Sequence, residues 1–575
     1  MNLGTRAART SLVTVDQQAG PLTEAHHQKG DGLESKNRSR AFRLMIAFLI
    51  LLGVVYTLRV GPPSMYAAWG FDSSISLVTA KALSEGRGFR LINHPDSPVS
   101  PYVSIGYPAL LALGLRFVSL DEIGITVLRA ISVITCLLFL LAGYHLLRRY
   151  VSPKAAAVAM LFVGLQPWVV VWSGELFREC PFAMLATAAV LLARKSIAEE
   201  SEHERRWWLN IGAAGLLAGL AVLTHTLGLA LLAGMAVALV ANRKWRKLSV
   251  LTLSSKLIVL PWVVWSALSV GSGSSLSNYY HWAVNYYHWW TPFTNLWRLF
   301  SQEAAIILFP PYGTPDGQFL LGQLHISWLF PALSLIAGAI FLKGLIALLK
   351  QRDVAAWCLV FYLTLVVLYP AGMTRYLMPA YVLMAIPLMT GVKLLRQQQR
   401  PRIPSRALSV TLATMLIFMA LGSLITNSLR ISGVYTFGNF YGAWGAKDWR
   451  ELTTAFDWIK ENVPQDGIVV TLYSCSTYLF TDRLTISPYH DATDSKTQPA
   501  SVARLEEVLA KVPAGTPVFV FARPFNLESE EISVTAVKGF VNEHPDQARL
   551  RWETPDHKMM IYEVIQPGRL LSRLR

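Results

Sequence analysis

Long apolar runs, each close to the length that crosses a lipid bilayer, dominate this chain between residues 43 and 427. A hydrocarbon core of about 30 Å requires roughly 20 apolar residues in a helix. Run length and flanking charge therefore predict about eleven membrane-spanning helices. We expect them at 43–60, 124–147, 153–172, 176–194, 208–224, 227–242, 248–269, 326–348, 354–371, 376–392 and 407–427. Such a chain folds as an α-helical polytopic membrane protein.

Composition supports this class and argues against a nucleic-acid-binding protein. Of 575 residues, 53% are hydrophobic and 15% are charged. The formal net charge of +16 comes from cations that cluster in short segments between the apolar spans. That distribution encodes orientation in a bilayer, so we expect a lipid bilayer as partner and no nucleic acid.

The cationic connections predict which side of the membrane each segment faces. Cations occupy one set of connections, which holds Arg148, Arg149, Arg194, Lys195, Arg205, Arg206, Arg243, Lys244, Arg246, Lys247, Lys350, Arg352 and the segment 393–406. The opposite set holds almost none apart from Arg178 and Arg375. By the positive-inside rule, the first set and the N-terminus are cytoplasmic, as in a multi-pass plasma membrane or bacterial inner membrane protein. The outer loops 61–123 and 271–325 are then extracytoplasmic.

Both ends of the chain differ in character from the transmembrane region 43–427. Residues 1–42 are polar and predict a disordered cytoplasmic tail. Residues 428–575 predict a small extracytoplasmic α/β domain, with helices at 449–462 and 504–511 and strands at 467–473, 518–522 and 559–564. The four cysteines show no ligand-like spacing and imply no disulfide framework.

Four predicted outer connections contribute ionisable side chains where few others occur. These side chains are Asp72, the pair Glu175 and Glu179, His225 and Arg375. The two glutamates are spaced i to i+4 and share one face of a helix. Ionisable groups at the border of a membrane bundle indicate a functional site.

Each of these residues also has a purely structural interpretation. Asp72 is a favoured type of N-cap for a helix over 73–84. The glutamates could pair with Arg178 at the interface, and His225 could be a satisfied histidine in a helix–helix turn. Arg375 could extend to lipid head groups. The functional hypothesis therefore rests on the set as a whole.

The set suits one kind of chemistry. A carboxylate can accept a proton from an attacking hydroxyl group. A guanidinium presents a planar fork that fits a phosphate. A sugar linked to a lipid phosphate presents its leaving group at this depth of the membrane. Together these features predict glycosyl transfer from a lipid carrier to an extracytoplasmic acceptor.

Several short motifs in matching order extend this interpretation to a family. The stretch Gly70-Phe71-Asp72 is followed by a helix that ends in the glycine-rich turn of residues 84–89. Further stretches are 107–111, which begins at Tyr107, then 127–132, 173–175, 375–379 and 458–464. In these the chain resembles the polytopic C-type (GT-C) glycosyltransferases that use polyprenyl- or dolichyl-phosphate sugars. The protein mannosyltransferase and lipid A aminoarabinose transferase branch is the most similar.

The resemblance implies roles for individual residues. Asp72 would be the general base of an inverting enzyme, and Arg375 would contact the donor phosphate. Glu175, Glu179, His225 and Tyr107 would bind the acceptor or support the site. The chain departs from many relatives, which carry an acidic pair where Asp72 is followed by Ser73. That departure bears on the acceptor, which could be a glycan, a lipid or a protein, and on metal use.

The outer loop 271–325 is rich in Trp and Tyr, which favours an interfacial aromatic belt over a platform for stacking a sugar or isoprenoid. His281 and His288 lack an accompanying carboxylate pattern, so we expect no metal ligands and no cofactor. Two other functions stay open, namely a sugar or lipid-carrier transporter and an inactive GT-C scaffold. A transporter predicts charged residues near the bilayer midplane and repeated halves, and no convincing internal repeat is found.

Overall fold

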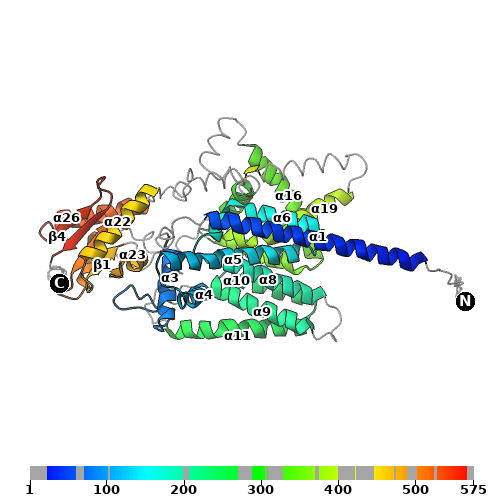
Figure 1. The fold of residues 1–575 in the computed structure, drawn as a ribbon, viewed down its shortest axis with the longest axis horizontal. Helices are drawn as coiled ribbons and strands as arrows, with labels where there is room; N and C mark the ends of the chain where they lie inside the picture. The colour runs from blue at the N-terminus through cyan, green and yellow to red at the C-terminus, as the bar shows by residue number, and fades with distance from the viewer. Residues whose placement is uncertain are drawn as a thin grey trace, which may run out of the picture.

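A computed structural model describes residues 22–59, 70–100, 104–198, 206–269, 288–304, 307, 328–369, 374–398, 421–422, 446–471, 474–487, 502–522 and 528–565. Its helices run side by side in a long bundle, with a small α/β domain at one end (Figure 1). The bundle region contains α1 (Leu22–Arg59), α3 (Gly70–Ser84), α4 (Gly106–Leu115), α5 (Glu122–Leu147), α6 (Pro153–Leu165), α7 (Pro167–Ser173), α8 (Glu179–Ala198), α9 (Arg206–Thr224), α10 (Gly228–Ala241), α11 (Trp245–Ser269), α13 (Thr291–Arg298), η1 (Leu299–Glu303), α16 (Leu329–Lys350), α17 (Val354–Leu368), α18 (Thr374–Leu377), η3 (Met378–Ala380) and α19 (Tyr381–Gln398).

The predicted membrane spans agree with these helices wherever the structure describes the chain. Seven described helices are long and apolar enough to cross a bilayer, and the bent pair α6–α7 makes an eighth. Helices α10 and α17 are apolar but shorter. The expected span at 407–427 lies outside the described residues, apart from 421–422.

Two predictions about these segments are wrong in detail. The span expected at 153–172 consists of two helices, α6 and α7, with a bend of 68° between them. Pro167 has no N–H to continue the helix, and it holds the preceding Gln166 in an extended conformation with ψ of 128°. Part of the tail expected to be disordered is helical, because α1 begins at Leu22 and no proline interrupts it before Arg59.

Glycines set how closely several helices approach. A Cβ on Gly215 of α9 would lie 2.0 Å from Ser254 Oγ of α11, and one on Gly234 of α10 would lie 2.4 Å from the Cα of Cys358 in α17. Only a residue without a side chain fits such contacts. Small residues at helix interfaces are a common packing device in membranes, as the glycine content of these helices predicts.

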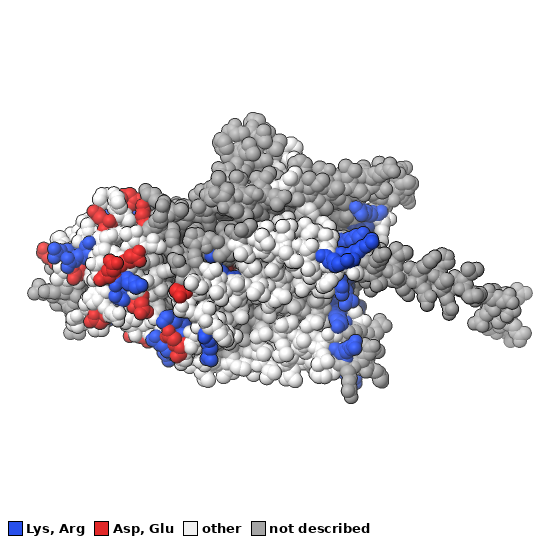
Figure 2. Space-filling view, viewed as in Figure 1, with Lys and Arg blue, Asp and Glu red and all other residues white. Residues whose placement is uncertain are grey.

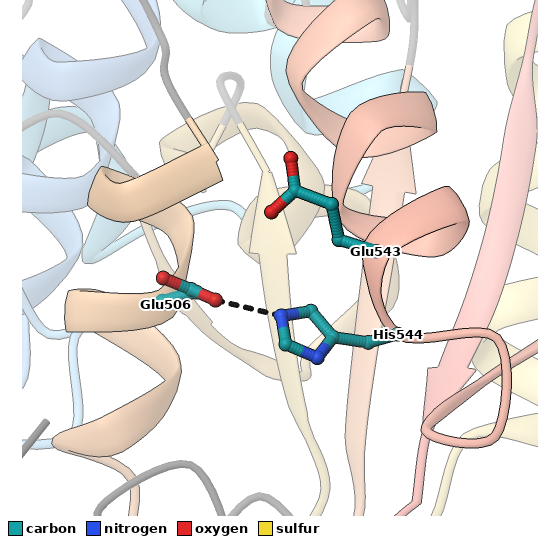
Figure 3. Close-up of side chains that lie close together, drawn as sticks. All are labelled: Glu506, Glu543 and His544. Atoms are coloured by element: carbon teal, nitrogen blue, oxygen red, sulfur yellow. Dashed lines mark hydrogen bonds and ion pairs between the residues drawn. The ribbon is translucent and has the colours of Figure 1, made fainter. Parts of the chain in front are cut away.

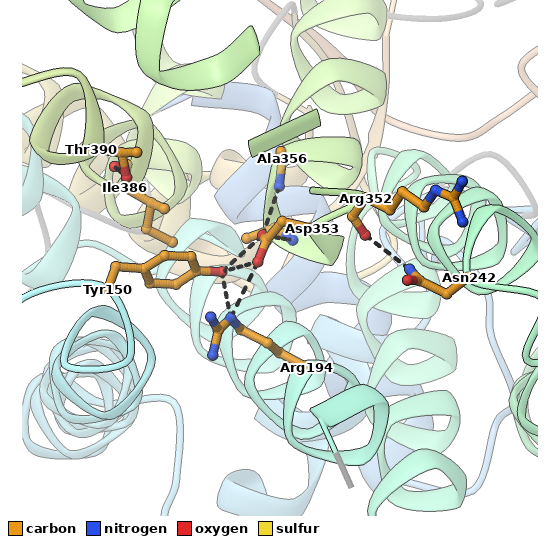
Figure 4. Close-up of polar contacts among 9 residues, drawn as sticks. Tyr150, Arg194, Asn242, Arg352, Asp353, Ala356, Ile386 and Thr390 are labelled. Atoms are coloured by element: carbon orange, nitrogen blue, oxygen red, sulfur yellow. Dashed lines mark hydrogen bonds and ion pairs between the residues drawn. The ribbon is translucent and has the colours of Figure 1, made fainter. Parts of the chain in front are cut away.

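The end of the bundle opposite the α/β domain collects the cationic connections. Figure 2 shows Lys and Arg in a band at this end and almost no charge along the exposed flank of the bundle. Figure 4 shows how three of these connections meet: Tyr150 donates to Asp353 Oδ1 at 2.8 Å, and Arg194 Nε donates to the Tyr150 hydroxyl at 2.7 Å. Asp353 also caps α17 by accepting from the Ala355 N–H at 2.9 Å. Those cationic connections that the structure describes thus group at one end of the bundle, as predicted.

The C-terminal domain is a five-stranded sheet in the order β2-β1-β3-β5-β4. Strand β1 is parallel to β2 and β3, whereas β5 is antiparallel to β3 and β4. Its elements are α22 (Ala446–Asn462), β1 (Ile468–Thr471), α23 (Ser474–Thr481), β2 (Leu484–Ile486), α25 (Val502–Ala510), β3 (Val518–Ala522), α26 (Glu528–Glu543), β4 (Ala548–Glu553) and β5 (Met560–Val564). The helices and strands expected here from the sequence are present, and the small α/β domain is confirmed.

Alternation along the central strands explains the layers of this domain. Val469 and Phe519 face α22 on one side of the sheet. Val470 and Val520 face α25 and α26 on the other. Successive side chains of a strand point to opposite faces, so strands that are apolar throughout are covered by helices on both sides.

Candidate active site

Asp72 lies in the first turn of α3, at the end of the bundle next to the α/β domain. Helix α3 begins at Gly70, so the alternative that Asp72 is its N-cap is wrong. The Asp72 carboxylate instead accepts a hydrogen bond of 2.7 Å from Arg375 Nη1. The backbone oxygen of Asp72 accepts from Ser76 Oγ at 2.6 Å, a bond within the helix that leaves the carboxylate available.

Arg375 lies in α18, which falls between α17 and α19 in the chain. Its Nε donates to Glu179 Oε1 and its guanidinium carbon lies 4.5 Å from the centre of the Phe177 ring. The side chain therefore points into the protein, and the interpretation that it extends to lipid head groups is wrong. Arg375 Nη2 is buried and has no hydrogen-bond partner among the described residues.

The short segment between α7 and α8 holds Glu175, whereas Glu179 is the first residue of α8, so the expectation that the two glutamates share one face of a helix is wrong. Helix α5 holds this segment in place. Arg129, which is fully buried, donates from Nε to the Gly174 oxygen at 2.7 Å. Ser132 Oγ donates to the Glu175 oxygen at 2.7 Å. Glu175 and Glu179 are both buried. The support by Arg129 and Ser132 was not predicted, although both lie in the family-like stretch 127–132.

His225 occupies the turn between α9 and α10 and packs its ring against Tyr376, with ring centres 5.6 Å apart. Its Nδ1 accepts a hydrogen bond from the Leu227 N–H at 3.2 Å. The neutral ring therefore carries its proton on Nε2, which is buried and without a hydrogen-bond partner among the described residues.

Tyr107 is buried and packs in one cluster with Leu77 and Ala80 of α3, so it supports the helix that carries Asp72. All four predicted outer connections thus come together around one site. The sequence predicted this convergence, whereas the direct bond between Asp72 and Arg375 is a structural finding.

The charges at the site favour an ionised Asp72. Desolvation by itself raises the pKa of Asp72. The positive charges of Arg375 and Arg178, with the hydrogen bond from Arg375, outweigh it and bring that pKa below its ordinary value. Arg178, which the sequence offered only as a partner for the glutamates, is therefore part of this electrostatic environment.

A second group of ionisable side chains lies in the C-terminal domain between α25 and α26 (Figure 3). Glu506, Glu543 and His544 place ligand-type atoms within 4.8 Å of one another. His544 Nε2 and Glu506 Oε1 already form a 2.7 Å pair that joins the two helices. We interpret the group as this helix-to-helix contact.

Comparisons with known proteins agree with this architecture. Residues 101–266 match the family described as dolichyl-phosphate-mannose-protein mannosyltransferase. The search of curated proteins gives no match.

Solved structures with the same fold cover nearly the whole chain. ArnT from Cupriavidus metallidurans in the apo state is similar with a TM-score of 0.58 and 12% identity, over 92% of this chain and 99% of that one. ArnT bound to undecaprenyl phosphate is similar with a TM-score of 0.55 and 12% identity, over 90% and 97%. The archaeal oligosaccharyltransferase AglB from Archaeoglobus fulgidus, in complex with an inhibitory peptide and a dolichol-phosphate, gives 0.53 and 15%, over 90% and 74%.

The fold, the order of its motifs and the matched family segment agree with one another. Residues 101–266 are similar to the protein mannosyltransferase family, and the chain has the GT-C fold that is seen in ArnT and AglB.

Proposed function

We propose that this protein is a membrane glycosyltransferase that moves a sugar from a polyprenyl-phosphate donor to an extracytoplasmic acceptor. The observation that carries the proposal is the bond between the Asp72 carboxylate and Arg375 at the meeting point of the four outer connections. Relatives of the same fold have been solved with undecaprenyl phosphate and with a dolichol-phosphate, which supports a donor of this class.

In the proposed reaction, an acceptor hydroxyl attacks the anomeric carbon of the donor sugar. The bond from that carbon to the phosphate oxygen breaks, and polyprenyl phosphate leaves with the bonding electrons. Asp72 takes the hydroxyl proton, a contribution of typically 10²–10⁴-fold for a general base. Arg375 binds the departing phosphate through its guanidinium. Direct attack inverts the anomeric configuration.

Arg375 can bind a phosphate through two of its nitrogen atoms, Nη1 and Nη2. Its Nη2 has no hydrogen-bond partner among the described residues, while its Nη1 is held by Asp72. A phosphate can bind to Nη2 and also compete with Asp72 for Nη1. The donor would then release the carboxylate that the reaction requires as base. Glu179 keeps its bond to Nε throughout and holds the guanidinium in place.

The test uses purified protein and a panel of polyprenyl-phosphate sugars, scored for sugar transfer and for release of polyprenyl phosphate. Asp72→Asn should lower transfer by at least about 100-fold, the low end for a lost general base. Asp96→Asn is the matched control, because Asp96 lies in the same outer segment with its side chain 88% exposed. Near-normal turnover by Asp72→Asn would reject the assignment of the base.

Further experiments test the phosphate contact, the need for a metal ion and the alternative that the protein is a transporter. Arg375→Ala should mainly raise the KM for the lipid donor, and an unchanged KM would reject the phosphate contact. We expect transfer to persist after EDTA treatment, because both carboxylates nearest Arg375 are engaged with that guanidinium. Movement of the donor lipid across the membrane without sugar release would instead identify a transporter.

A further inference from the structure

The C-terminal domain is attached to the helix that carries Asp72 through a buried apolar contact. Helix α23 packs against α3, and Cys475 and Tyr478 of α23 form one cluster with Val78 and Ala82 of α3. Cys475 is buried in this contact, and burial raises the pKa of its thiol to about 12. Lys81 of α3 adds a cation over the Tyr478 ring, 5.9 Å from its centre.

A buried polar contact reinforces this attachment at Asn93, in the segment that follows α3. Its Nδ2 donates to Thr485 Oγ1 at 3.1 Å, and its backbone oxygen accepts from the Thr485 N–H at 2.7 Å. Asn93 is 3% exposed and Thr485 is fully buried. Thr485 lies in β2, the edge strand, so Asn93 takes up a backbone donor at the open edge of the sheet.

The hydroxyl of Thr485 connects the contact to α23 as well. Thr485 Oγ1 donates to the Ser474 oxygen at 2.9 Å, at the residue where α23 begins. Asn93 therefore holds β2, and Thr485 holds the first residue of the helix that packs on α3. Buried polar groups of this kind are costly when one partner is removed, so they specify a single arrangement of the two parts.

Helix α3 links this contact to the catalytic end of the site. Val78 and Ala82 lie on the same 15-residue helix as Asp72. The opposite side of α3 packs on α4, where Leu77 and Ala80 contact Tyr107. The helix is thus held between the bundle and the C-terminal domain, and its position sets the distance from Asp72 to Arg375.

We propose that Asn93 and Thr485 are positioning residues, which fix the C-terminal domain on α3 and thereby hold Asp72 against Arg375. The inference rests on the proposed function and assigns the C-terminal domain a part in catalysis. A general base must be held in a narrow range of geometry, and a misplacement of about 1 Å can cost on the order of 100-fold in rate.

The experiment compares Asn93→Ala, Thr485→Val and the double variant in the full-length protein. Each single variant should lower kcat by between about 10- and 100-fold without raising the KM for the lipid donor, because Arg375 and Glu179 stay in place. The double variant should be no worse than the poorer single variant, since both break one contact. The acid limb of kcat/KM should also move to higher pH, because Asp72 loses part of its contact with Arg375.

Matched variants separate positioning from a general loss of folded protein. Thr485→Ser keeps Oγ1 and should have wild-type kcat, whereas Thr485→Val has nearly the same volume and should not. Glu507→Gln changes an exposed side chain of α25 elsewhere in the same domain and should have no effect. A lower melting temperature with wild-type kcat would show that the contact serves stability alone and would overturn the inference.

The outcomes for the inference and for the proposed function are distinguishable. If Asp72→Asn is inactive while Asn93→Ala and Thr485→Val keep full kcat and an unshifted acid limb, only the positioning inference fails. If Asp72→Asn is active, the assignment of the base fails first. Losses in the two single variants that multiply in the double variant would show two independent effects and would also reject the shared contact.

Discussion

The two carboxylates that bind Arg375 differ in their access to solvent. The side chain of Glu179 is 1% exposed, whereas that of Asp72 is 45% exposed. A buried carboxylate paired with a guanidinium holds that guanidinium in a fixed orientation. A half-exposed one can exchange its partner and meet a substrate hydroxyl. Geometry alone thus separates Glu179 as the residue that orients Arg375 from Asp72 as the residue able to act as base.

The pKa of Asp72 leads to a prediction about pH dependence. The charges of Arg375 and Arg178 outweigh desolvation and bring this pKa below its ordinary value, so Asp72 stays ionised at lower pH than an ordinary aspartate does. The acid limb of kcat/KM, which reports the free enzyme, should therefore lie at lower pH than an ordinary aspartate would give. Arg375→Gln removes the positive charge nearest to Asp72. Desolvation, which raises the pKa of Asp72, is then less opposed, so this limb should move to higher pH. A limb that stays in place in this variant would mean that another group titrates.

Removal of Glu179 should affect stability as well as binding. Glu179→Gln leaves Arg375 without its buried partner, a change that typically costs about 3–5 kcal/mol for a buried ion pair. The matched control is Glu85→Gln, which breaks the partly exposed pair with Lys81 and should cost about 0–1 kcal/mol. Thermal unfolding in detergent measures both. Equal melting temperatures for the two variants would contradict the anchoring role of Glu179.

At the level of helices and strands, local patterns predict the elements and miss where they bend or face solvent. Apolar run length predicts the spans because the lipid imposes one length on all of them. Pro167 can be read from the sequence, but the size of the bend that it causes depends on the packing around α7. The strands β1, β3 and β5 are almost wholly buried and were predicted. Strand β4 is mostly exposed and lacks the apolar pattern that would reveal it.

The close contact of α9 and α11 gives a prediction at this scale. Gly215→Ala should destabilise the protein by about 1–3 kcal/mol, the usual cost of excess volume, because the new Cβ meets Ser254 Oγ and the Leu251 oxygen. Gly212→Ala in the same helix is the control, since its Cβ would lie 3.8 Å from Val250. The melting temperature of the Gly215→Ala protein should be the lower of the two. The reverse order would show that these helices do not pack closely in the membrane.

For the molecule as a whole, topology predicts which groups share a face but not which ones touch. Asp72 and Arg375 are separated by 303 positions, yet the positive-inside rule assigned both to one side. The contact between Asn93 and Thr485 spans 392 positions and has no local signal. Neither the sequence around Asn93 nor the sequence around Thr485 indicates that the C-terminal domain contacts the segment that follows α3. Such contacts arise from tertiary packing alone.

The predicted orientation can be tested by labelling in intact bacterial cells with a membrane-impermeant maleimide. Glu507→Cys places a thiol in α25 of the C-terminal domain, at a side chain that is 46% exposed, and Lys350→Cys places one at an exposed position beside the α16–α17 turn. The four native cysteines are buried and should give little background. An extracytoplasmic C-terminal domain predicts labelling of Glu507→Cys only, and permeabilised cells should label both. Labelling of Lys350→Cys alone in intact cells would show the opposite orientation in the membrane. Asp72 would then lie on the cytoplasmic side.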